Sequence, residues 1–157
     1  MGAKELKPAY IIDIDGILSK SEVRGQFKED VAKGNFEFFA NMMPHFQPNK
    51  WAIGLTRALS HDYVVIFLTA RSEEYRQDTC DWIHRHVGIS NFKLIMRDVS
   101  GEEDHVVKKR LYLEKVRGRY HVLAAIDDTK EVSKLWKTLN IPSLWLLDEE
   151  VKIEQEQ

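Results

Sequence analysis

Five short apolar runs recur along the chain, and segments with a different periodicity separate them. The runs cover residues 9–14, 62–69, 92–96, 121–126 and 143–147. Continuous apolar runs of this length are typical of parallel strands that are covered on both faces. The pattern therefore predicts five strands in a buried parallel sheet.

The segments between the apolar runs carry hydrophobic residues at helical spacing. They predict one helix that Asn49 caps, one from Ser72 to Gly88, and two over residues 104–117 and 130–139. In the first of these helices, Trp51, Leu55 and Leu59 form the expected apolar stripe. Strands that alternate with helices through short connections indicate an α/β fold, Rossmann-like, with α/β/α layers and right-handed crossovers.

One stretch interrupts this alternation. Residues 19–48 form a long insertion after the first strand and include Phe36, Phe38, Phe39, Met42, Met43 and Phe46. They are expected to form a small helical subdomain with its own apolar face, or a cap over an active site, and the two interpretations are compatible. The aromatic side chains could pack in a core or stack against a nucleobase.

Length and composition indicate a single domain over residues 1–157. The 23 basic and 25 acidic residues give a net charge of −2, which argues against a large surface that wraps duplex nucleic acid. No apolar run approaches the roughly 18 residues of a membrane span, and the N-terminus lacks the apolar stretch of a signal peptide. With Cys80 as the single cysteine, the chain is expected in a reducing cytoplasm, that of the host if a phage encodes it.

Charged and hydroxyl side chains follow the apolar runs, at the edge where α/β sheets bind their ligands. They are Asp13 and Asp15 after the first run, Thr69 and Arg71 after the second, Arg97 after the third, and Asp127 and Asp128 after the fourth. Four carboxylates at one edge need a cation, and oxygen ligands favour Mg²⁺. Mg²⁺ beside arginine and threonine predicts a phosphate-binding site.

The two acids of DIDGI predict covalent phosphoryl transfer. A carboxylate can attack phosphorus, which assigns Asp13 as the nucleophile, and a second carboxyl group can transfer the proton, which assigns Asp15 as the acid/base. Asp127, alone or with Asp128, is expected to hold the metal. In DHVVKKR, Lys108 shares a helix face with Asp104, whereas the next lysine does not. That spacing fits a phosphate-site lysine and an exposed surface pair equally well.

In order along the chain, DIDGI, LTAR, the lysine of VVKKR and IDD resemble the four motifs of the haloacid dehalogenase superfamily of phosphotransferases. RSEEYRQDTCDWI, DHVVKKRLY and AIDDTKEVSKLWKTLNI further resemble the 3′-phosphatase subgroup of the bacteriophage polynucleotide kinase type. The resemblance covers almost the whole chain. The P-loop pattern G-x-x-x-x-G-K-[ST] of a kinase half does not occur in the sequence.

The resemblance implies a set of site residues and Mg²⁺ as the cofactor. Asp13 is the implied nucleophile, and Asp15 is the implied acid/base. The implied metal ligands are Asp13, Asp15, Asp127 and Asp128. The implied contacts to phosphate or substrate are Thr69, Ala70, Lys108, Arg24, Arg71, Arg97 and Asp104.

Three positions depart from the pattern of the subgroup. Ile17 stands in place of threonine, Ala70 in place of glycine and Thr129 in place of arginine. The insertion at 19–48 is also longer than in the bacteriophage enzyme. These departures bear on the choice of substrate rather than on the type of reaction.

The residues and the resemblance together predict a Mg²⁺-dependent phosphomonoesterase that removes 3′-phosphates from DNA or RNA ends. Two alternatives stay open at this point: a nucleotidase for free nucleoside monophosphates, and a binding module that keeps the fold without catalysis. The expected partner is a nucleic acid 3′-phosphate end or a nucleotide, bound as substrate. No membrane partner is expected, and a separate kinase or ligase partner stays open.

Overall fold

The computed structural model describes residues 5–20, 36–98 and 101–146. In these residues, five parallel strands form one sheet in the order β3-β2-β1-β4-β5. The strands are β1 Lys7–Ile12, β2 Val64–Ser72, β3 Phe92–Arg97, β4 Tyr120–Asp127 and β5 Ser143–Trp145. The predicted five-stranded parallel sheet is therefore confirmed.

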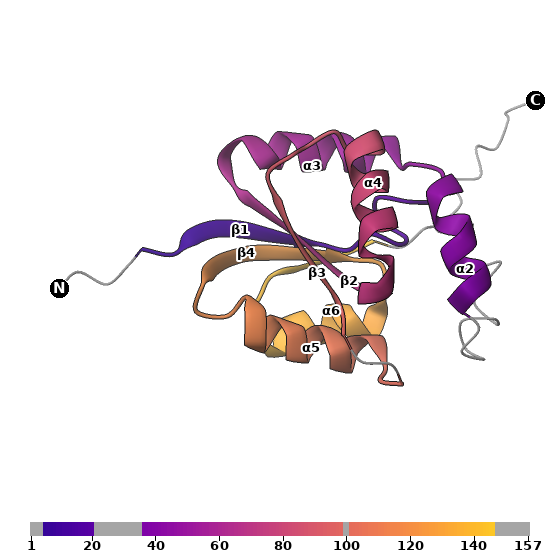
Figure 1. The fold of residues 1–157 in the computed structure, drawn as a ribbon. Helices are drawn as coiled ribbons and strands as arrows, with labels where there is room; N and C mark the ends of the chain where they lie inside the picture. Colours follow the sequence, from indigo (N-terminus) through magenta and orange to yellow (C-terminus); the bar gives the residue numbers. More distant parts are fainter. Residues whose placement is uncertain (1–4, 21–35, 99–100, 147–157) are drawn as a thin grey trace, which may run out of the picture.

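Helices cover both faces of the sheet, as Figure 1 shows. α3 (Lys50–Asp62) and α4 (Arg76–His86) lie on one face, and α5 (Asp104–Lys115) and α6 (Lys130–Thr138) lie on the other. This arrangement confirms the predicted α/β/α layers. None of the described helices is long and apolar enough to cross a membrane.

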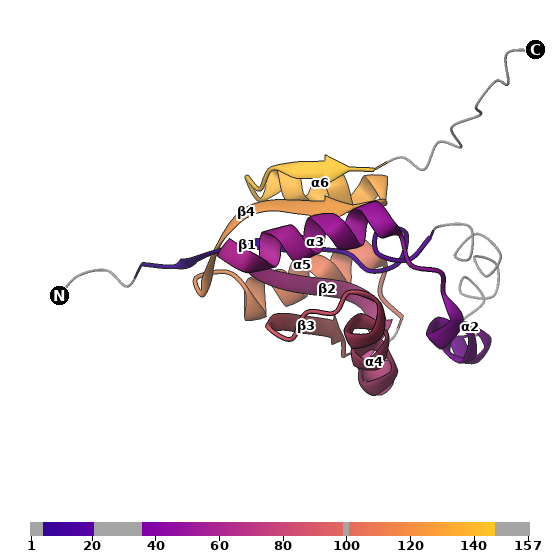
Figure 2. The same cartoon turned by 90° about the horizontal axis from the view of Figure 1, so that it is seen from above.

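The described part of the insertion holds α2 (Phe36–Met42) and a 3₁₀ turn, η1 (Met43–His45). In Figures 1 and 2, α2 lies beyond the end of the sheet at which β1 leads into its following loop. Met43 and Phe46 are buried in the core, and the Phe39 ring packs against Phe46 with 5.2 Å between the ring centroids. These three side chains pack with the core, whereas Arg24 lies outside the described residues.

Two apolar clusters hold the layers together. Between the sheet and α3–α4, Phe67, Trp82 and Ile83 are fully buried, and between the sheet and α5–α6, Leu111 and Trp136 are buried. Removing an apolar side chain of this size from water contributes about 2 kcal/mol to stability. The clusters therefore make the sheet a rigid support for the loops at its ends.

α3 buries a different face from the one that its sequence predicts. Ala52, Ile53 and Thr56 are buried, whereas Trp51 and Leu55 are 52% and 40% exposed. The small Ala52 side chain lets this face approach the sheet closely, and the Thr56 hydroxyl group is satisfied by donating to Ala52 O at 2.8 Å. The expected stripe through Trp51 and Leu55 is wrong because close packing against the sheet selects small side chains over large ones.

The predicted helix start at Ser72 is displaced by one turn. β2 continues to Ser72, whose Oγ accepts a hydrogen bond from Glu74 N at 3.4 Å and begins the 3₁₀ turn η2 (Glu73–Tyr75). α4 follows from Arg76. Gly88 stands just after its end, as predicted, with φ +70° and a hydrogen bond to Ile83 O at 3.1 Å.

The strand order reverses between β1 and β4. The chain adds β2 and β3 on one side of β1, and then adds β4 and β5 on the other side. Such a reversal opens a crevice at the carboxyl ends of the strands, where open α/β sheets bind ligands. Asp13 N donates to Ile126 O at 3.0 Å and so joins the ends of β1 and β4 at this point.

Candidate active site

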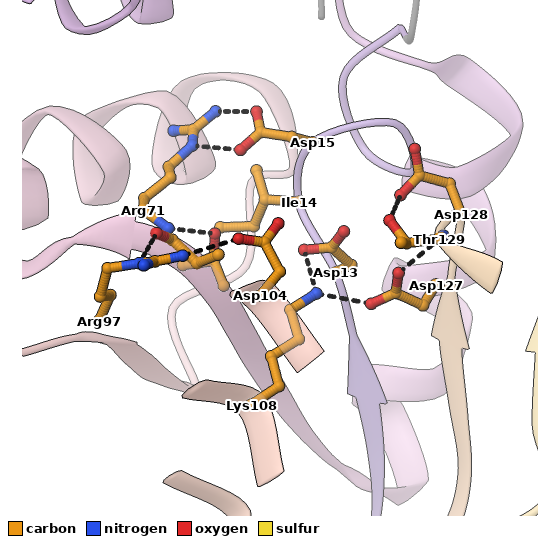
Figure 3. Close-up of polar contacts among 12 residues, drawn as sticks. Asp13, Ile14, Asp15, Arg71, Arg97, Asp104, Lys108, Asp127, Asp128 and Thr129 are labelled. Carbon is orange, nitrogen blue, oxygen red and sulfur yellow. Dashed lines mark hydrogen bonds and ion pairs between the residues drawn. The ribbon is translucent and has the colours of Figure 1, made fainter. Parts of the chain in front are cut away.

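Eight of the predicted functional side chains meet at the carboxyl edge of the sheet, as Figure 3 shows. One group, here called the carboxylate side, consists of Asp13, Asp127, Asp128 and Lys108. A second group, here called the arginine side, consists of Asp15, Arg71, Arg97 and Asp104. The two sides differ in geometry and in charge.

On the carboxylate side, Asp13, Asp127 and Asp128 each offer an oxygen atom, and these atoms all lie within 4.8 Å of one another. Lys108 Nζ lies 3.1 Å from Asp13 Oδ1 and donates to Asp127 Oδ2 at 2.6 Å. Three carboxylates and one ammonium group leave a formal charge of −2. Asp13, Asp127 and Lys108 are buried, so water screens this excess charge poorly.

The donor set of the carboxylate side fits a divalent cation. Carboxylate oxygens are the hard ligands that Mg²⁺ prefers, and their spacing allows them to converge on one ion. A divalent cation also matches the excess charge. Asp15, the fourth implied ligand, does not bring its carboxylate into this group, because Arg71 holds both of its oxygens on the arginine side.

Lys108 is the lysine of VVKKR that reaches the site. It is buried on α5, whereas the neighbouring Lys109 is exposed. Burial by itself lowers the pKa of Lys108, but the charges of Asp127 and Asp13 and the hydrogen bond to Asp127 raise that pKa above its ordinary value. The amine therefore stays protonated and places a fixed positive charge beside Asp13.

Gly16 and Thr129 shape the surroundings of Asp128. Gly16 has φ +86°, and a Cβ atom at this position would collide with Asp128 Oδ2. Thr129 donates through its backbone N to Asp127 Oδ1 at 2.9 Å and through Oγ1 to Asp128 Oδ1 at 3.3 Å. The glycine after the two acids of DIDGI is thus required by the backbone conformation and by the position of Asp128.

On the arginine side, Asp15 forms a bidentate ion pair with Arg71. Arg71 Nε and Nη2 donate to the two carboxylate oxygens of Asp15 at 2.9 and 2.7 Å (Figure 3). Arg71 is itself buried: Nη1 donates to Thr79 Oγ1 at 3.2 Å, and the guanidinium carbon lies 5.9 Å from the centroid of the Phe46 ring. Thr79 and Phe46 therefore position Arg71, which in turn positions Asp15.

Arg97 connects the loop at the end of β2 to the start of α5. Its Nε donates to Ala70 O at 2.8 Å, its Nη1 to Glu102 O at 2.7 Å and its Nη2 to Asp104 Oδ1 at 2.7 Å. Each nitrogen of the guanidinium group thus has a protein acceptor. This geometry fits a positioning role for Arg97 and Asp104, whereas the resemblance implied a contact to phosphate or substrate.

Thr69, at the end of β2, and Ile17, one of the departures from the subgroup, also lie near the site. Thr69 is buried, and its Oγ1 accepts a hydrogen bond from Arg71 N at 3.2 Å. Ile17, which stands in place of the threonine of the subgroup, is buried in the apolar cluster under α3 and α4. Its backbone O accepts a hydrogen bond from Asn49 Nδ2 at 3.0 Å. The apolar side chain at position 17 is therefore accommodated by the core.

Sequence reasoning did not identify several residues that shape the site. Thr79 falls within the predicted helix from Ser72 to Gly88 and Phe46 within the insertion, and neither position indicates a contact with Arg71. The signal for Thr79 was its hydroxyl group in a helix that packs on the sheet, because a buried hydroxyl group needs a partner. Trp145 gave no such signal, yet its Nε1 donates to Asp128 O at 3.1 Å.

Known proteins share the sequence of this site region. Residues 7–148 match the family described as the polynucleotide kinase PNKP phosphatase domain. A protein of Autographa californica nuclear polyhedrosis virus, assigned as a bifunctional polynucleotide kinase/RNA ligase, is 34% identical over 86 residues. The matched region covers 54% of this chain and 12% of the viral protein.

Solved structures share the fold. A chain of the Pnkp1/Rnl/Hen1 RNA repair complex matches 93% of this chain with a TM-score of 0.76 and 26% identity, and the match covers 44% of that chain. A haloacid dehalogenase-like hydrolase from Streptococcus pneumoniae matches 90% of this chain and 85% of its own, with a TM-score of 0.64 and 15% identity, which shows the fold alone. This chain spans less than half the length of the viral protein and of the repair-complex chain. Because the family match extends over most of its residues, the chain belongs to the polynucleotide kinase PNKP phosphatase-domain family of haloacid dehalogenase-type phosphatases.

Proposed function

We propose that this chain is a Mg²⁺-dependent phosphomonoesterase that removes 3′-phosphates from DNA or RNA ends through an aspartyl-phosphate on Asp13. The observation that carries the proposal is the carboxylate side, where Asp13 lies with two other carboxylates and the Lys108 ammonium group at a formal charge of −2. A carboxylate nucleophile needs such surroundings, because its own charge repels the charge of a phosphate group.

The proposed reaction has two steps. In the first, an oxygen of Asp13 attacks phosphorus, the bond from phosphorus to the 3′-oxygen breaks, and Asp15 gives a proton to that oxygen. In the second, Asp15 takes a proton from water, whose oxygen attacks phosphorus and releases inorganic phosphate from Asp13. When bound by Asp13, Asp127 and Asp128, Mg²⁺ supplies positive charge that offsets the repulsion between nucleophile and phosphate.

Arg71 controls the acid/base in this proposal. Both oxygens of Asp15 accept hydrogen bonds from Arg71, so proton transfer requires Asp15 to exchange at least one of these contacts. A substrate phosphate competes for the same guanidinium group, because arginine binds phosphate oxygens in the same bidentate manner. We therefore assign Arg71 as a phosphate contact that releases Asp15 when substrate binds.

The remaining predicted residues take supporting roles in the proposal. In this proposal, Thr69, Ala70, Arg97 and Asp104 hold the end of β2 that carries Arg71, which their hydrogen bonds support. Lys108 neutralises charge on Asp13 and on the phosphate group. Arg24 stays a proposed substrate contact.

Family membership and the names of the relatives support a nucleic acid end as the substrate. The viral relative is named for kinase and ligase activities, and another relative belongs to an RNA repair complex. We propose that a separate kinase or ligase works with this phosphatase. The proposed location is the cytoplasm, that of the host for a phage-encoded chain, which the single Cys80 supports.

The test is a comparison of kcat/KM, at fixed salt, among an oligonucleotide with a 3′-phosphate, its 5′-phosphorylated counterpart and a mononucleotide. We expect the 3′-phosphate to be hydrolysed fastest, chelation to stop the reaction and Mg²⁺ to restore it. Preference for the mononucleotide would replace the proposal with the nucleotidase alternative. No hydrolysis of any of the three substrates with Mg²⁺ present would favour the binding module.

A further inference from the structure

Trp145 differs from the core tryptophans because a large part of its ring is exposed. Trp82 and Trp136 are 1% exposed, whereas Trp145 is 38% exposed. An aromatic surface left in water forgoes the free energy that its burial would contribute. Trp51 on α3 is also exposed, at 52%, and serves as a comparison below.

Trp145 lies one hydrogen bond away from the carboxylate side. It is the last residue of β5 and lies opposite Asp127 of β4 in the sheet register. Its indole Nε1 donates to Asp128 O at 3.1 Å, and the next backbone group, Leu146 N, donates to Asp127 O at 3.1 Å. The side chain and the backbone at this position are therefore both tied to the loop that carries the proposed metal ligands.

This attachment holds the ring by its polar edge, while Trp145 stays 38% exposed. In the part of the sheet that the structure describes, β5 is the edge strand, so no described strand lies beyond Trp145 (Figure 2). A fixed aromatic ring exposed next to a phosphate site has the properties of a stacking platform, because nucleobases stack on aromatic side chains.

We propose that Trp145 stacks against the nucleobase of the 3′-terminal nucleotide while the 3′-phosphate of that nucleotide lies between the carboxylate and arginine sides. The inference rests on the proposed function and narrows its substrate to ends that carry an intact terminal base. Every base has a π-face, so the contact accepts DNA and RNA ends of any sequence. The subgroup has an arginine where this chain has Thr129, beside Asp128. The stack on Trp145 supplies a substrate contact on that same side of the site.

The test uses two oligonucleotides that each carry a 3′-phosphate and differ in the last nucleotide, which is normal in one and abasic in the other. Trp145→Ala is expected to lower kcat/KM for the normal substrate roughly fivefold or more, the loss typical of one base–aromatic stack. The same variant should lower kcat/KM for the abasic substrate by a smaller factor, equal to that of Trp145→Phe, because both variants lose the hydrogen bond to Asp128 O. Trp51→Ala, the matched control, should change neither value.

Trp145→Phe separates stacking from a structural role. Phenylalanine keeps an aromatic face but loses the N–H that donates to Asp128 O, so stacking predicts that this variant retains most of the activity on the normal substrate. A structural role for the hydrogen bond predicts instead that both variants lose activity on both substrates equally. That outcome, or wild-type activity of Trp145→Ala on the normal substrate, overturns the inference.

A binding measurement separates this inference from the proposed function. In a Trp51→Phe protein, Trp145 is the one substantially exposed tryptophan of the three that remain. The normal oligonucleotide should quench its fluorescence more strongly than the abasic one does. Quenching without hydrolysis would keep the stacking contact and reject the 3′-phosphatase activity. Hydrolysis with equal quenching by both oligonucleotides would keep the activity and reject the contact.

Discussion

On the arginine side of the site two carboxylates meet two guanidinium groups, whereas on the carboxylate side three carboxylates meet one ammonium group. Asp15 and Asp104 each accept hydrogen bonds from an arginine, so the charges on the arginine side cancel. Asp13 and Asp127 both pair with Lys108, and carboxylate oxygens of Asp13, Asp127 and Asp128 lie within 4.8 Å of one another. The difference shows that the net charge of each side, and not only its number of acids, indicates where a cation could bind.

The two sides therefore respond differently to what binds them. Negative charges that lie close together and are largely buried repel one another strongly, so the carboxylate side gains most from a cation. On the arginine side, the charges of the carboxylates and the guanidinium groups already cancel. A phosphate can bind an arginine there only by displacing a carboxylate from it. Five substitutions test this comparison, and they follow in order of expected effect on activity.

Asp13→Asn should reduce turnover by at least about 10⁴-fold, because an amide cannot attack phosphorus to form the covalent intermediate. Release of inorganic phosphate under saturating substrate measures the effect. Thermal unfolding should show that the variant is folded. Turnover close to that of the wild type would reject Asp13 as the nucleophile.

Asp15→Asn should lower kcat by about 10²–10⁴-fold through loss of proton transfer. Because the Asp15 carboxylate belongs to the arginine side, the Mg²⁺ concentration for half-maximal rate should stay unchanged. A Mg²⁺ titration of the residual activity checks this. An increase in the required Mg²⁺ concentration would indicate that the Asp15 carboxylate is a metal ligand, which would contradict the division between the two sides.

Asp127→Asn should raise the Mg²⁺ concentration for half-maximal rate by at least about tenfold, since it removes one of the three converging carboxylates. The matched control is Asp98→Asn. Asp98 is partly exposed just after β3 and pairs with Arg110 at 2.8 Å, away from this group. The control should leave the Mg²⁺ requirement at the wild-type value, and an equal change in both variants would reject a specific metal site.

Gly16→Ala should raise the Mg²⁺ requirement by a smaller factor, a few-fold, because the added Cβ atom displaces the Asp128 carboxylate. The control is Gly118→Ala, where φ is +75° and no atom lies near the added Cβ. Both variants should lose about 1–2 kcal/mol of stability from the left-handed backbone conformation. Only Gly16→Ala should alter the metal dependence, and a change in both would mean that the collision is not the cause.

Thr79→Val should lower kcat/KM about fivefold, because Arg71 loses one hydrogen bond that contributes about 1 kcal/mol to its position. The control is Thr56→Val, which removes a buried hydroxyl group of α3 whose partner is Ala52 O. Both variants should lower the unfolding temperature, but only Thr79→Val should lower activity. Equal activities would show that Arg71 does not depend on Thr79.

Local patterns were sufficient for the elements and for most of the candidate residues. Apolar runs predicted all five strands, because a strand that is buried on both faces consists almost entirely of apolar residues. Helical spacing selected Lys108 over Lys109, and the structure buries Lys108 beside Asp13 and Asp127. The same reasoning failed for Trp51 and Leu55, because spacing shows that a helix has a face but close packing decides which face is buried.

Only the tertiary structure decided how the acids divide between the two sides. β1 ends at Ile12, so the alternation of a strand no longer sets the directions of the Asp13 and Asp15 side chains. Their distant partners, Lys108 and Arg71, set these directions instead. The sheet order places the end of β4 beside β1, and β5 brings Trp145 to Asp128. The sequence by itself determined the candidate residues for the chemistry, since their types and their order are local. The pairing of each acid with a lysine or an arginine was decided by contacts between segments far apart in the chain. No local periodicity encodes the geometry of such contacts.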